Sequence, residues 1–323
     1  MKENKMSQAP SKALVIMAFA AVYLIWGSTY LGIKYAIETI PPFFMAGARF
    51  LTAGLVLMLW CFLKGEELPR GKPLAFIALG GVLMLFVGNA AVGWVEQYLP
   101  TGLAAIVVAS LPLWFVALDK RQWHYNFSHK WIIIGVLVGF SGVLLLVLGK
   151  STLDIAGDRM RVISILVLIT GTMCWATGSL ITKYKKIKGS TTAKAGIQML
   201  AAGAVSLLAG CISKEQNNFE LGKVSSTSII ALCYLIVIGS LVAYMSYIWL
   251  LSVRSASIVS TYAYVNPIVA VFLGWLMLDE VIGLNQLIAL GVILLGVVLV
   301  NLPKAKKEKA VEGSQLVLTA DQP

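Results

Sequence analysis

Three charged residues lie within or beside long apolar stretches of the chain. Arg49 lies seven residues into the apolar stretch 43–63, where a charge inside a membrane is costly and therefore indicates a functional role. Lys34 follows the first apolar stretch, and Glu96 lies in the short connection after residues 73–93. We predict that Arg49 pairs with Glu96, or that either of these two residues binds the charged end of a solute. A structural role, as an ion pair or an arginine capped by backbone carbonyls, explains the same residues equally well.

Aromatic and amide side chains form a second group of candidates in the same stretches. The group comprises Trp26, Tyr30, Asn89, Trp175, Tyr244, Tyr247, Tyr262 and Asn266. Trp26 and Tyr30 are four residues apart and share a helix face, as do Tyr262 and Asn266. Such residues combine apolar surface with a few hydrogen-bonding tips, which suits a cavity for amino acids or amphiphilic solutes. Packing or interface anchoring is the alternative for each position.

Glu96 is also the carboxylate best placed for proton coupling. A partly buried glutamate holds its proton more tightly and releases it when the protein reorients. This predicts proton antiport. An uncoupled facilitator or a channel is the alternative, since channels also need polar residues in their spans.

Motifs of enzyme chemistry are absent from the sequence. We find no HExxH, no Walker A loop, no GxSxG and no intramembrane pair of His or Asp. The four cysteines lie in separate apolar stretches without CxxC spacing, and both histidines, His124 and His129, lie in one polar connection. We therefore expect neither an enzyme, nor a metal, nor a cofactor.

The candidate residues belong to a chain with the composition of a membrane protein. Of its 323 residues 59% are hydrophobic and 13% are charged, against roughly 25% charged in soluble domains. Crossing a bilayer takes about 20 apolar residues in a helix. Ten such stretches are present, near residues 13–33, 43–63, 73–93, 101–118, 131–149, 162–182, 193–212, 229–250, 257–277 and 283–301. The first stays apolar up to Ile33, so it is expected to be a retained span rather than a signal peptide.

The distribution of positive charge predicts the orientation of these spans. With a cytoplasmic N-terminus, 19 of the 26 Lys and Arg residues fall in inner segments, six fall in outer segments, and Arg49 lies inside a span. Because positive charge stays on the cytoplasmic side of short loops, both termini are expected in the cytoplasm, at residues 1–12 and 303–323. The C-terminal segment reads as basic and disordered. The net charge of +11 follows from this topology, so no nucleic-acid partner is expected.

The chain repeats itself. A shift of 149 residues places WGSTYLGIKY, which starts at Trp26, on WATGSLITKY, which starts at Trp175. The same shift places Arg49 on Gln198, within a pair of aligned segments that are identical at seven of fourteen positions.

A shift of 155 residues aligns the later part of each half. It places Trp94 on Trp249 and Glu96 on Leu251, so the second half lacks both charges. Because each half has five spans, an odd number, the second half is expected to enter the bilayer upside down. Two such copies predict a substrate site near the midplane and alternating access.

At these residues the chain resembles a known family, the EamA group of the drug/metabolite transporter superfamily. The resemblance runs from about Tyr23 to Val300, and its specific parts are IWGSTY (25–30), PPFFMAGARFL (41–51), VGN (87–89), PTGLAAIVVA (100–109) and TYAYVNPIVAVFLG (261–274). It implies an all-α integral membrane fold of ten transmembrane helices, arranged as two inverted five-helix EamA repeats at residues 13–149 and 162–302. It also implies export of amino acids, related metabolites or drug-like compounds without ATP hydrolysis.

Together these patterns predict a multi-pass secondary active transporter of the bacterial inner membrane. Its expected partners are a small-molecule substrate and membrane lipids. No dimer-forming face is evident and one chain supplies both repeats, so we expect a monomer.

Overall fold

The protein is entirely helical in the part of the chain that its computed structural model describes, residues 11–148, 159–185, 187–281 and 283–320. No strand occurs among these residues. The predicted cytoplasmic N-terminus up to residue 10 and most of the connection between the two repeats lie outside the described residues. The sequence prediction of an all-α fold is therefore confirmed for the described residues.

Helices cover the apolar stretches of the first half. They are α1 (Lys12–Ala20), η1 (Ala21–Ile25) and α2 (Trp26–Ala36); α3 (Pro42–Lys64); α4 (Pro73–Gly81), η2 (Val82–Ala90) and α5 (Ala91–Val95); α6 (Thr101–Val108) and α7 (Leu111–Leu118); η3 (Lys120–Gln122) and α8 (Trp123–Ser128); and α9 (Lys130–Leu148). The segments η1 and η2 are π-helical turns within continuous helices. Such turns locally widen a helix and are frequent at functional sites.

The second half follows the same order. Its helices are α11 (Arg159–Tyr184); α12 (Thr191–Ile212); η4 (Glu215–Asn218) and η5 (Leu221–Lys223); α13 (Ser226–Tyr234), η6 (Leu235–Tyr244) and α14 (Met245–Val253); α15 (Ala256–Val259) and α16 (Tyr262–Leu278); and α17 (Leu284–Ala320). The π-helical segment η6 occupies the place that η2 has in the first half. The two halves therefore share even this irregularity.

Seven helices in the described part of the chain are long and apolar enough to cross a membrane. They correspond to the first four predicted spans and to the sixth, seventh and eighth. The fifth belongs to a helix pair, 120–128 and 130–145, bent by 105°, and shorter apolar helices at Val265–Leu278 and Leu284–Val300 cover the last two. The predicted number of ten crossings stays a prediction.

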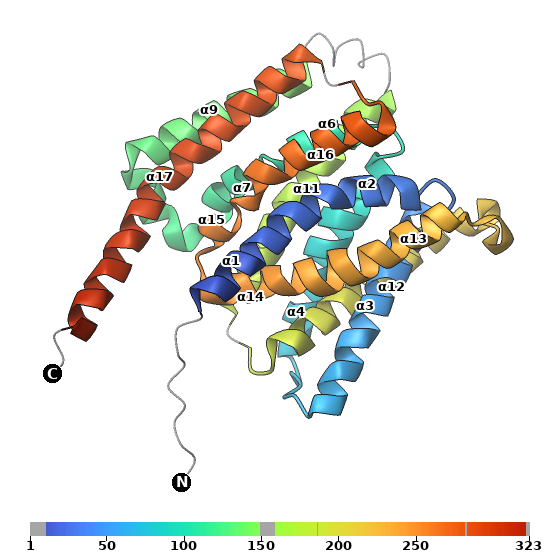
Figure 1. Cartoon of the computed structure of the whole chain (residues 1–323), viewed down its shortest axis with the longest axis horizontal. Coiled ribbons are helices and arrows are strands. Elements are labelled where there is room, and N and C mark those ends of the chain that lie inside the picture. The colour runs from blue at the N-terminus through green and yellow to red at the C-terminus, as the bar shows by residue number, and fades with distance from the viewer. Residues whose placement is uncertain (1–10, 149–158, 186, 282, 321–323) are drawn as a thin grey trace.

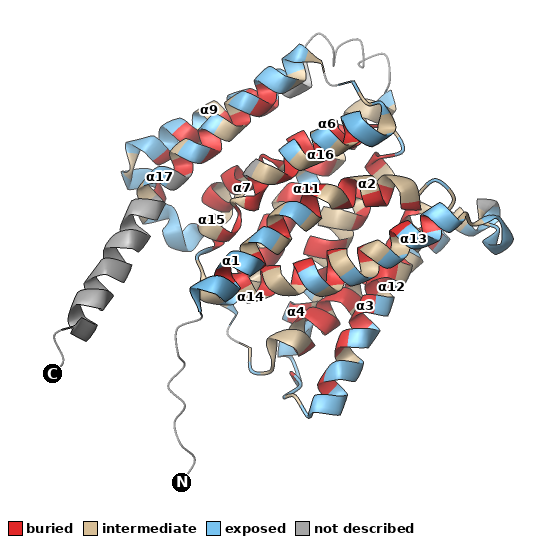
Figure 2. Ribbon diagram, viewed as in Figure 1, coloured by how far each residue is buried: buried red, intermediate tan, exposed pale blue. Residues whose placement is uncertain are grey.

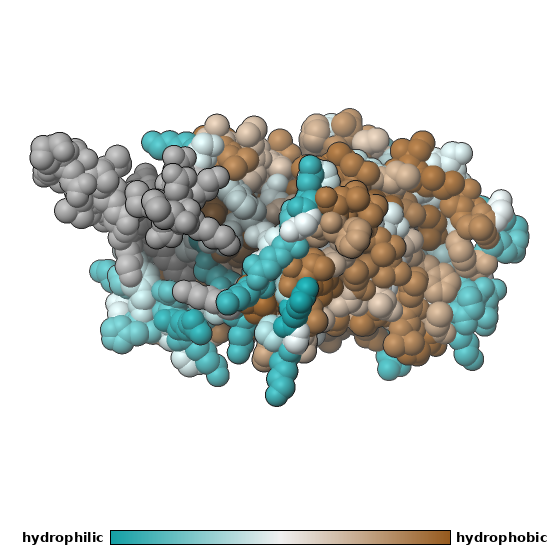
Figure 3. Space-filling model, turned by 90° about the horizontal axis from the view of Figure 1, so that it is seen from below, coloured by the Kyte–Doolittle hydropathy of each residue, from teal (hydrophilic) through white to brown (hydrophobic). Residues whose placement is uncertain are grey.

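Large apolar side chains point outward over much of the surface. Phe62, Ile212 and Leu284 are each more than 70% exposed, although soluble proteins rarely expose large contiguous apolar patches. Figure 2 places pale blue, exposed residues on the outer sides of the helices, and Figure 3 shows a broad brown, apolar area with teal residues gathered to either side. Such a surface fits a bilayer.

The helix contacts follow a two-fold pattern. Helices at equivalent places in the two halves pack on each other, namely α3 on α12, α9 on α17 and α6 on α16 (Figure 1). Contacts between non-equivalent helices also come in related pairs. The contact of η2 with α11 corresponds to that of α13 with α2. The contact of α7 with α11 corresponds to that of α16 with α2. This arrangement fits a two-repeat architecture.

Close backbone contact joins α9 and α17, which lie side by side at one edge of the molecule (Figure 1). Gly135 and Gly139 of α9 are four residues apart, and a Cβ atom on Gly296 of α17 would lie 2.4 Å from the Gly139 backbone. This is the small-residue spacing that lets membrane helices approach closely. The chain uses this spacing for an internal contact.

The last helix differs from its predicted form. We expected a disordered segment from residue 303, whereas α17 continues to Ala320 and contains Pro303. Residues 304–310 read KAKKEKA, and Lys, Glu and Ala all have high helix propensity. These propensities explain why the helix does not end where the apolar stretch ends.

Candidate functional site

A cavity of about 50 Å³ lies between the two halves of the chain. Its walls come from α2, η2, α5, α6, α7, α11 and α16, with Trp26, Thr29, Tyr30, Ile33, Gly88, Asn89, Val92, Val108, Leu111, Thr172, Trp175, Tyr262 and Asn266 as lining residues. Six of the ten predicted site residues are among them. The sequence did not single out Thr29 and Thr172, since a threonine in an apolar helix usually bonds its own backbone, as both do here.

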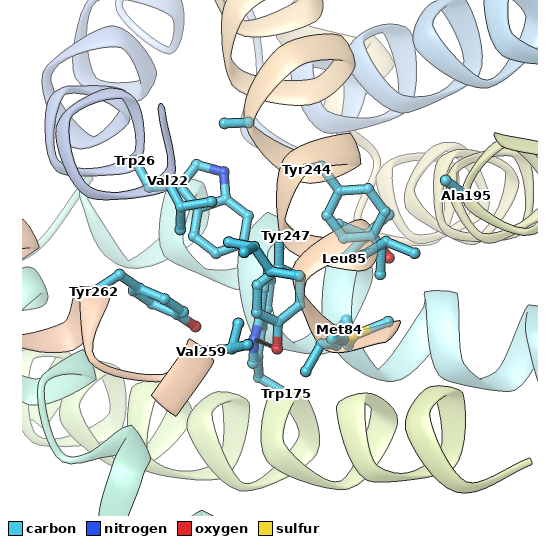
Figure 4. Close-up of a cluster of buried hydrophobic side chains, with 14 of the residues drawn as sticks. Val22, Trp26, Met84, Leu85, Trp175, Ala195, Tyr244, Tyr247, Val259 and Tyr262 are labelled. Atoms are coloured by element: carbon cyan, nitrogen blue, oxygen red, sulfur yellow. Dashed lines mark hydrogen bonds between the residues drawn. The ribbon is translucent and has the colours of Figure 1, made fainter. Parts of the chain in front are cut away.

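Four aromatic rings from four spans meet at one side of the cavity (Figure 4). The Trp26 ring lies at their centre, with centroid distances of 5.3 Å to Trp175, 4.9 Å to Tyr247 and 5.0 Å to Tyr262. The contacts to Trp175 and Tyr262 are edge-on, the geometry that aromatic quadrupoles favour. Trp26, Trp175 and Tyr262 form a wall of the cavity with members from both repeats, and the Tyr247 ring packs against it.

Tyr247 lies behind this wall and is hydrogen-bonded to two residues of α11. Its hydroxyl accepts from Trp175 Nε1 at 3.1 Å and lies 2.6 Å from Ser179 Oγ. Tyr244, one turn away, donates to Gln198 Oε1 at 2.8 Å. Both tyrosines are buried, and neither lines the cavity. The structure therefore places these two predicted residues outside the cavity lining, where they support the aromatic wall.

Arg49 is buried and does not pair with Glu96. Its Nε donates to Ser240 Oγ at 2.9 Å, and its Nη1 donates to Asn89 Oδ1 at 3.1 Å. Both Glu96 carboxylate oxygens lack a hydrogen-bond partner among the residues that the structure describes. The predicted ion pair was wrong, because the arginine side chain reaches sideways to neighbouring spans and Glu96 lies beyond the end of its helix.

The hydrogen bond between Arg49 and Asn89 has a counterpart at the equivalent positions of the second repeat. The repeat places Arg49 on Gln198 and Asn89 on Tyr244, and the second pair is joined by the Tyr244 to Gln198 hydrogen bond. In each half, a polar pair thus links the second span to the third. Only the first half uses a charge and an amide that lines the cavity.

Glu96 is fully buried at one end of the cavity. It follows α5 one turn beyond Val92, which lines the cavity. Burial raises the pKa of the Glu96 carboxyl well above its ordinary value, the positive charge of Lys34 opposes this rise, and Glu280 adds to it. A buried carboxyl without partners is costly in its charged form, so this group is suited to hold a proton.

Lys34 caps the end of the span that carries Glu96. Its ammonium donates to the Glu96 backbone carbonyl at 2.8 Å. Lys183, its counterpart in the second repeat, donates in the same way to the Leu251 carbonyl at 3.0 Å. A lysine near a helix C-terminus satisfies free carbonyls and complements the helix dipole. Lys34, which we grouped with Arg49 and Glu96, therefore stabilises a helix end.

Glu280 fastens the start of α6, which forms part of the cavity wall. One carboxylate oxygen accepts from the Thr101 backbone N–H at 2.8 Å, and the other accepts from the Thr101 hydroxyl at 2.9 Å and from the Gly102 N–H at 3.1 Å. A carboxylate here satisfies free N–H groups at the helix N-terminus. The sequence analysis missed this residue, and no local signal indicates it.

With the fold and the cavity described, comparison with known proteins defines the class. The model of the EamA-like transporter family matches residues 13–148 and again residues 162–302. The chain therefore belongs to the EamA-like transporter family and is a multi-pass inner-membrane transporter.

Individual relatives agree with this class. The chain is 38% identical over 289 residues to YedA of Escherichia coli K12, named an uncharacterized inner membrane transporter, covering 89% of this chain and 90% of that protein. It is 27% identical over 300 residues to protein PecM of Dickeya dadantii, covering 91% and 96%. A solved crystal structure that is 18% identical superposes with a TM-score of 0.64, covering 90% of this chain and 98% of that chain, and so supports the fold.

Replacing Tyr247 with phenylalanine is expected to lower stability modestly. The change removes the oxygen that serves Trp175 and Ser179 and leaves two buried polar groups without that partner. We expect a loss of about 1–2 kcal/mol, measured as a lower melting temperature of the purified protein. Tyr98→Phe is the matched control, because the hydroxyl of the half-buried Tyr98 makes no hydrogen bond within the described part of the chain. Equal melting temperatures for both variants would contradict the supporting role of Tyr247.

Proposed function

We propose that the protein is a secondary transporter of ten spans in two inverted repeats, with both termini in the cytoplasm. It exports amino acids or related small metabolites by alternating access. The observation that carries the proposal is the cavity itself, because both repeats contribute side chains to its walls. A site between two related halves can open to either side when the halves rock against each other.

The lining of the cavity favours an amphiphilic solute. Indole and phenol rings supply apolar surface, while Asn89, Asn266 and two threonines supply hydrogen-bonding groups. Arg49 lies directly behind Asn89 and offers positive charge to a carboxylate. These are the groups that would bind an amino acid by its charged end and its apolar side chain.

The cavity is too narrow for the proposed substrate in this form of the protein. A volume of about 50 Å³ accommodates a few water molecules at roughly 10–15 Å³ of probe space each, and is too small for an amino acid. The four-ring cluster and the Glu280 contact to α6 both hold the surrounding helices together. Rocking of the repeats would then enlarge the cavity toward one side at a time.

A screen followed by an exchange assay tests the proposal. Amino acids and metabolites are first screened for those that raise the melting temperature of the purified protein, because a ligand of the folded state stabilises it. Proteoliposomes loaded with an excess of that unlabelled ligand should then transiently accumulate the labelled ligand from outside. Saturable counterflow is expected of a carrier. A channel or pore, the alternative function, would give equilibration without counterflow and would refute alternating access.

A further inference from the structure

A hollow of about 530 Å³ opens where the end of α11 meets the start of α12 and the end of α14. Its lining residues are Thr182, Lys183, Tyr184, Lys185, Ile187, Lys188, Thr191, Lys194, Ile248, Leu251 and Ser252. It is separate from the cavity between the repeats, since the two share no lining residue. It lies on the lysine-rich side, which we propose above to face the cytoplasm.

Positive charge dominates this hollow. Four lysines line it and no carboxylate does. Lys183 is engaged with the carbonyls of Leu251 and Arg254, and the Lys185 ammonium lies 4.4 Å from the centroid of the Phe76 ring. Lys188 is exposed, and Lys194 is half-buried with Glu67 near enough to act on its charge. The hollow therefore presents a net positive site to an anion.

The two-fold related hollow on the other side carries the opposite charge. Residues Ile187, Lys188, Thr191 and Ser252 correspond in the repeat to Glu38, Thr39, Pro42 and Gln97, and all of the latter line a hollow of about 650 Å³. That hollow holds three glutamates and one lysine, Lys223, which is paired with Glu220 at 2.9 Å. The fold thus produces a hollow at both places, and the charge of each is specific to its side.

The rest of the lysine-lined hollow suits a lipid better than a soluble anion. Ile187, Ile248 and Leu251 add an apolar part to the lining, and the exposed ring of Phe76 lies next to Lys185. Thr191 and Ser252 add hydroxyl-bearing residues to the same lining. A lipid phosphate would meet the ammonium and hydroxyl groups while its glycerol and acyl chains meet the apolar side chains.

We propose that this hollow binds the phosphate of an anionic phospholipid from the inner leaflet, with Lys188 and Lys194 as its principal charged contacts. Basic pockets between membrane helices on the cytoplasmic side are suited to such headgroups. The assignment to the inner leaflet rests on the orientation proposed above, whereas lipid binding in the hollow does not depend on transport and is tested without it.

Melting temperatures in defined lipids test the site. The full-length protein is compared in detergent with added phosphatidylglycerol, with added phosphatidylcholine, and with glycerol 3-phosphate at the same concentration. We expect phosphatidylglycerol to raise the melting temperature above the phosphatidylcholine value, and glycerol 3-phosphate to leave it unchanged. The Lys188→Gln/Lys194→Gln variant should lose at least half of that rise. A rise of the same size with glycerol 3-phosphate would replace the lipid proposal with a soluble-anion site.

Matched controls separate site binding from general charge. Lys64→Gln/Lys72→Gln removes two lysines from the two ends of the connection between α3 and α4, on the same proposed side, and should keep the full rise. An equal loss in this control would overturn the site. If the double variant fails to fold, native mass spectrometry of the wild type in an equal mixture of the two lipids decides, because the proposal requires preferential retention of phosphatidylglycerol that weakens as salt is raised. Equal retention of both lipids would refute the proposal.

Discussion

Arg49→Gln is expected to reduce transport at least tenfold while the protein still inserts and folds. The guanidinium of Arg49 holds Asn89 in the cavity wall and Ser240 in η6. Glutamine is shorter and uncharged, so Asn89 and Ser240 lose these donors and a solute carboxylate loses its positive partner. A buried hydrogen bond to a charged group contributes about 1.5–3 kcal/mol, which corresponds to at least tenfold in rate or affinity. Counterflow in proteoliposomes measures the effect, and a melting curve verifies folding.

The second repeat supplies a variant that separates structure from binding. Arg49→Gln/Asn89→Tyr installs in the first half the pair that Gln198 and Tyr244 form in the second. If Arg49 links the two helices, this variant should recover stability. Because Asn89 lines the cavity, transport is compared with that of Asn89→Tyr alone, and we expect lower transport in the double variant if Arg49 also serves the solute. Full transport by Arg49→Gln alone would show that neither role matters.

The helical fold was predictable because hydropathy alone determines which stretches can cross a bilayer. Helices occur at all the predicted stretches, and the sequence shifts of 149 and 155 residues anticipated the two-fold contacts such as α3 on α12. The bend before α9 was not predicted. Such a bend depends on tertiary packing, which residue composition does not specify.

The aromatic part of the site was predictable for a different reason. Trp26 and Tyr30, like Tyr262 and Asn266, share a face by helical spacing, and these four line the cavity. Spacing along one helix fixes a shared face, but it does not tell which face points to the cavity. For Tyr244 and Tyr247 the shared face points to hydrogen-bond partners behind the wall.

Contacts between distant charged groups were the part that sequence patterns missed. Arg49 and Glu96 are both buried polar residues, yet the partners of Arg49 are an amide and a hydroxyl. Glu280 and Thr101 are 179 residues apart, and a glutamate in a connection resembles any solvated charge. Pairing of this kind depends on the relative position of helix ends, which needs the three-dimensional structure.

Glu96→Gln is expected to uncouple transport from the proton gradient. The buried Glu96 carboxyl has a raised pKa, with Lys34 and Glu280 as the charged groups that act on it. We therefore expect it to keep its proton while closed, and to release the proton when opening brings in water and its pKa returns toward the ordinary value of about 4.3. Glutamine cannot change charge, so accumulation driven by an imposed gradient should fall at least tenfold while counterflow at equal pH persists.

The pH dependence of stability provides an independent measurement on the same variant. Because the folded-state pKa of Glu96 lies above the unfolded value, proton binding stabilises the folded protein at low pH, and this stabilisation is lost as the pH rises through the folded-state pKa. The melting temperature of the wild type should fall over that interval more steeply than that of Glu96→Gln. Parallel curves together with unchanged gradient-driven accumulation would exclude Glu96 as the proton site and would favour the uncoupled facilitator. A flattened curve with unchanged accumulation would instead make Glu96 a structural proton site, because a group that titrates without limiting transport does not couple it.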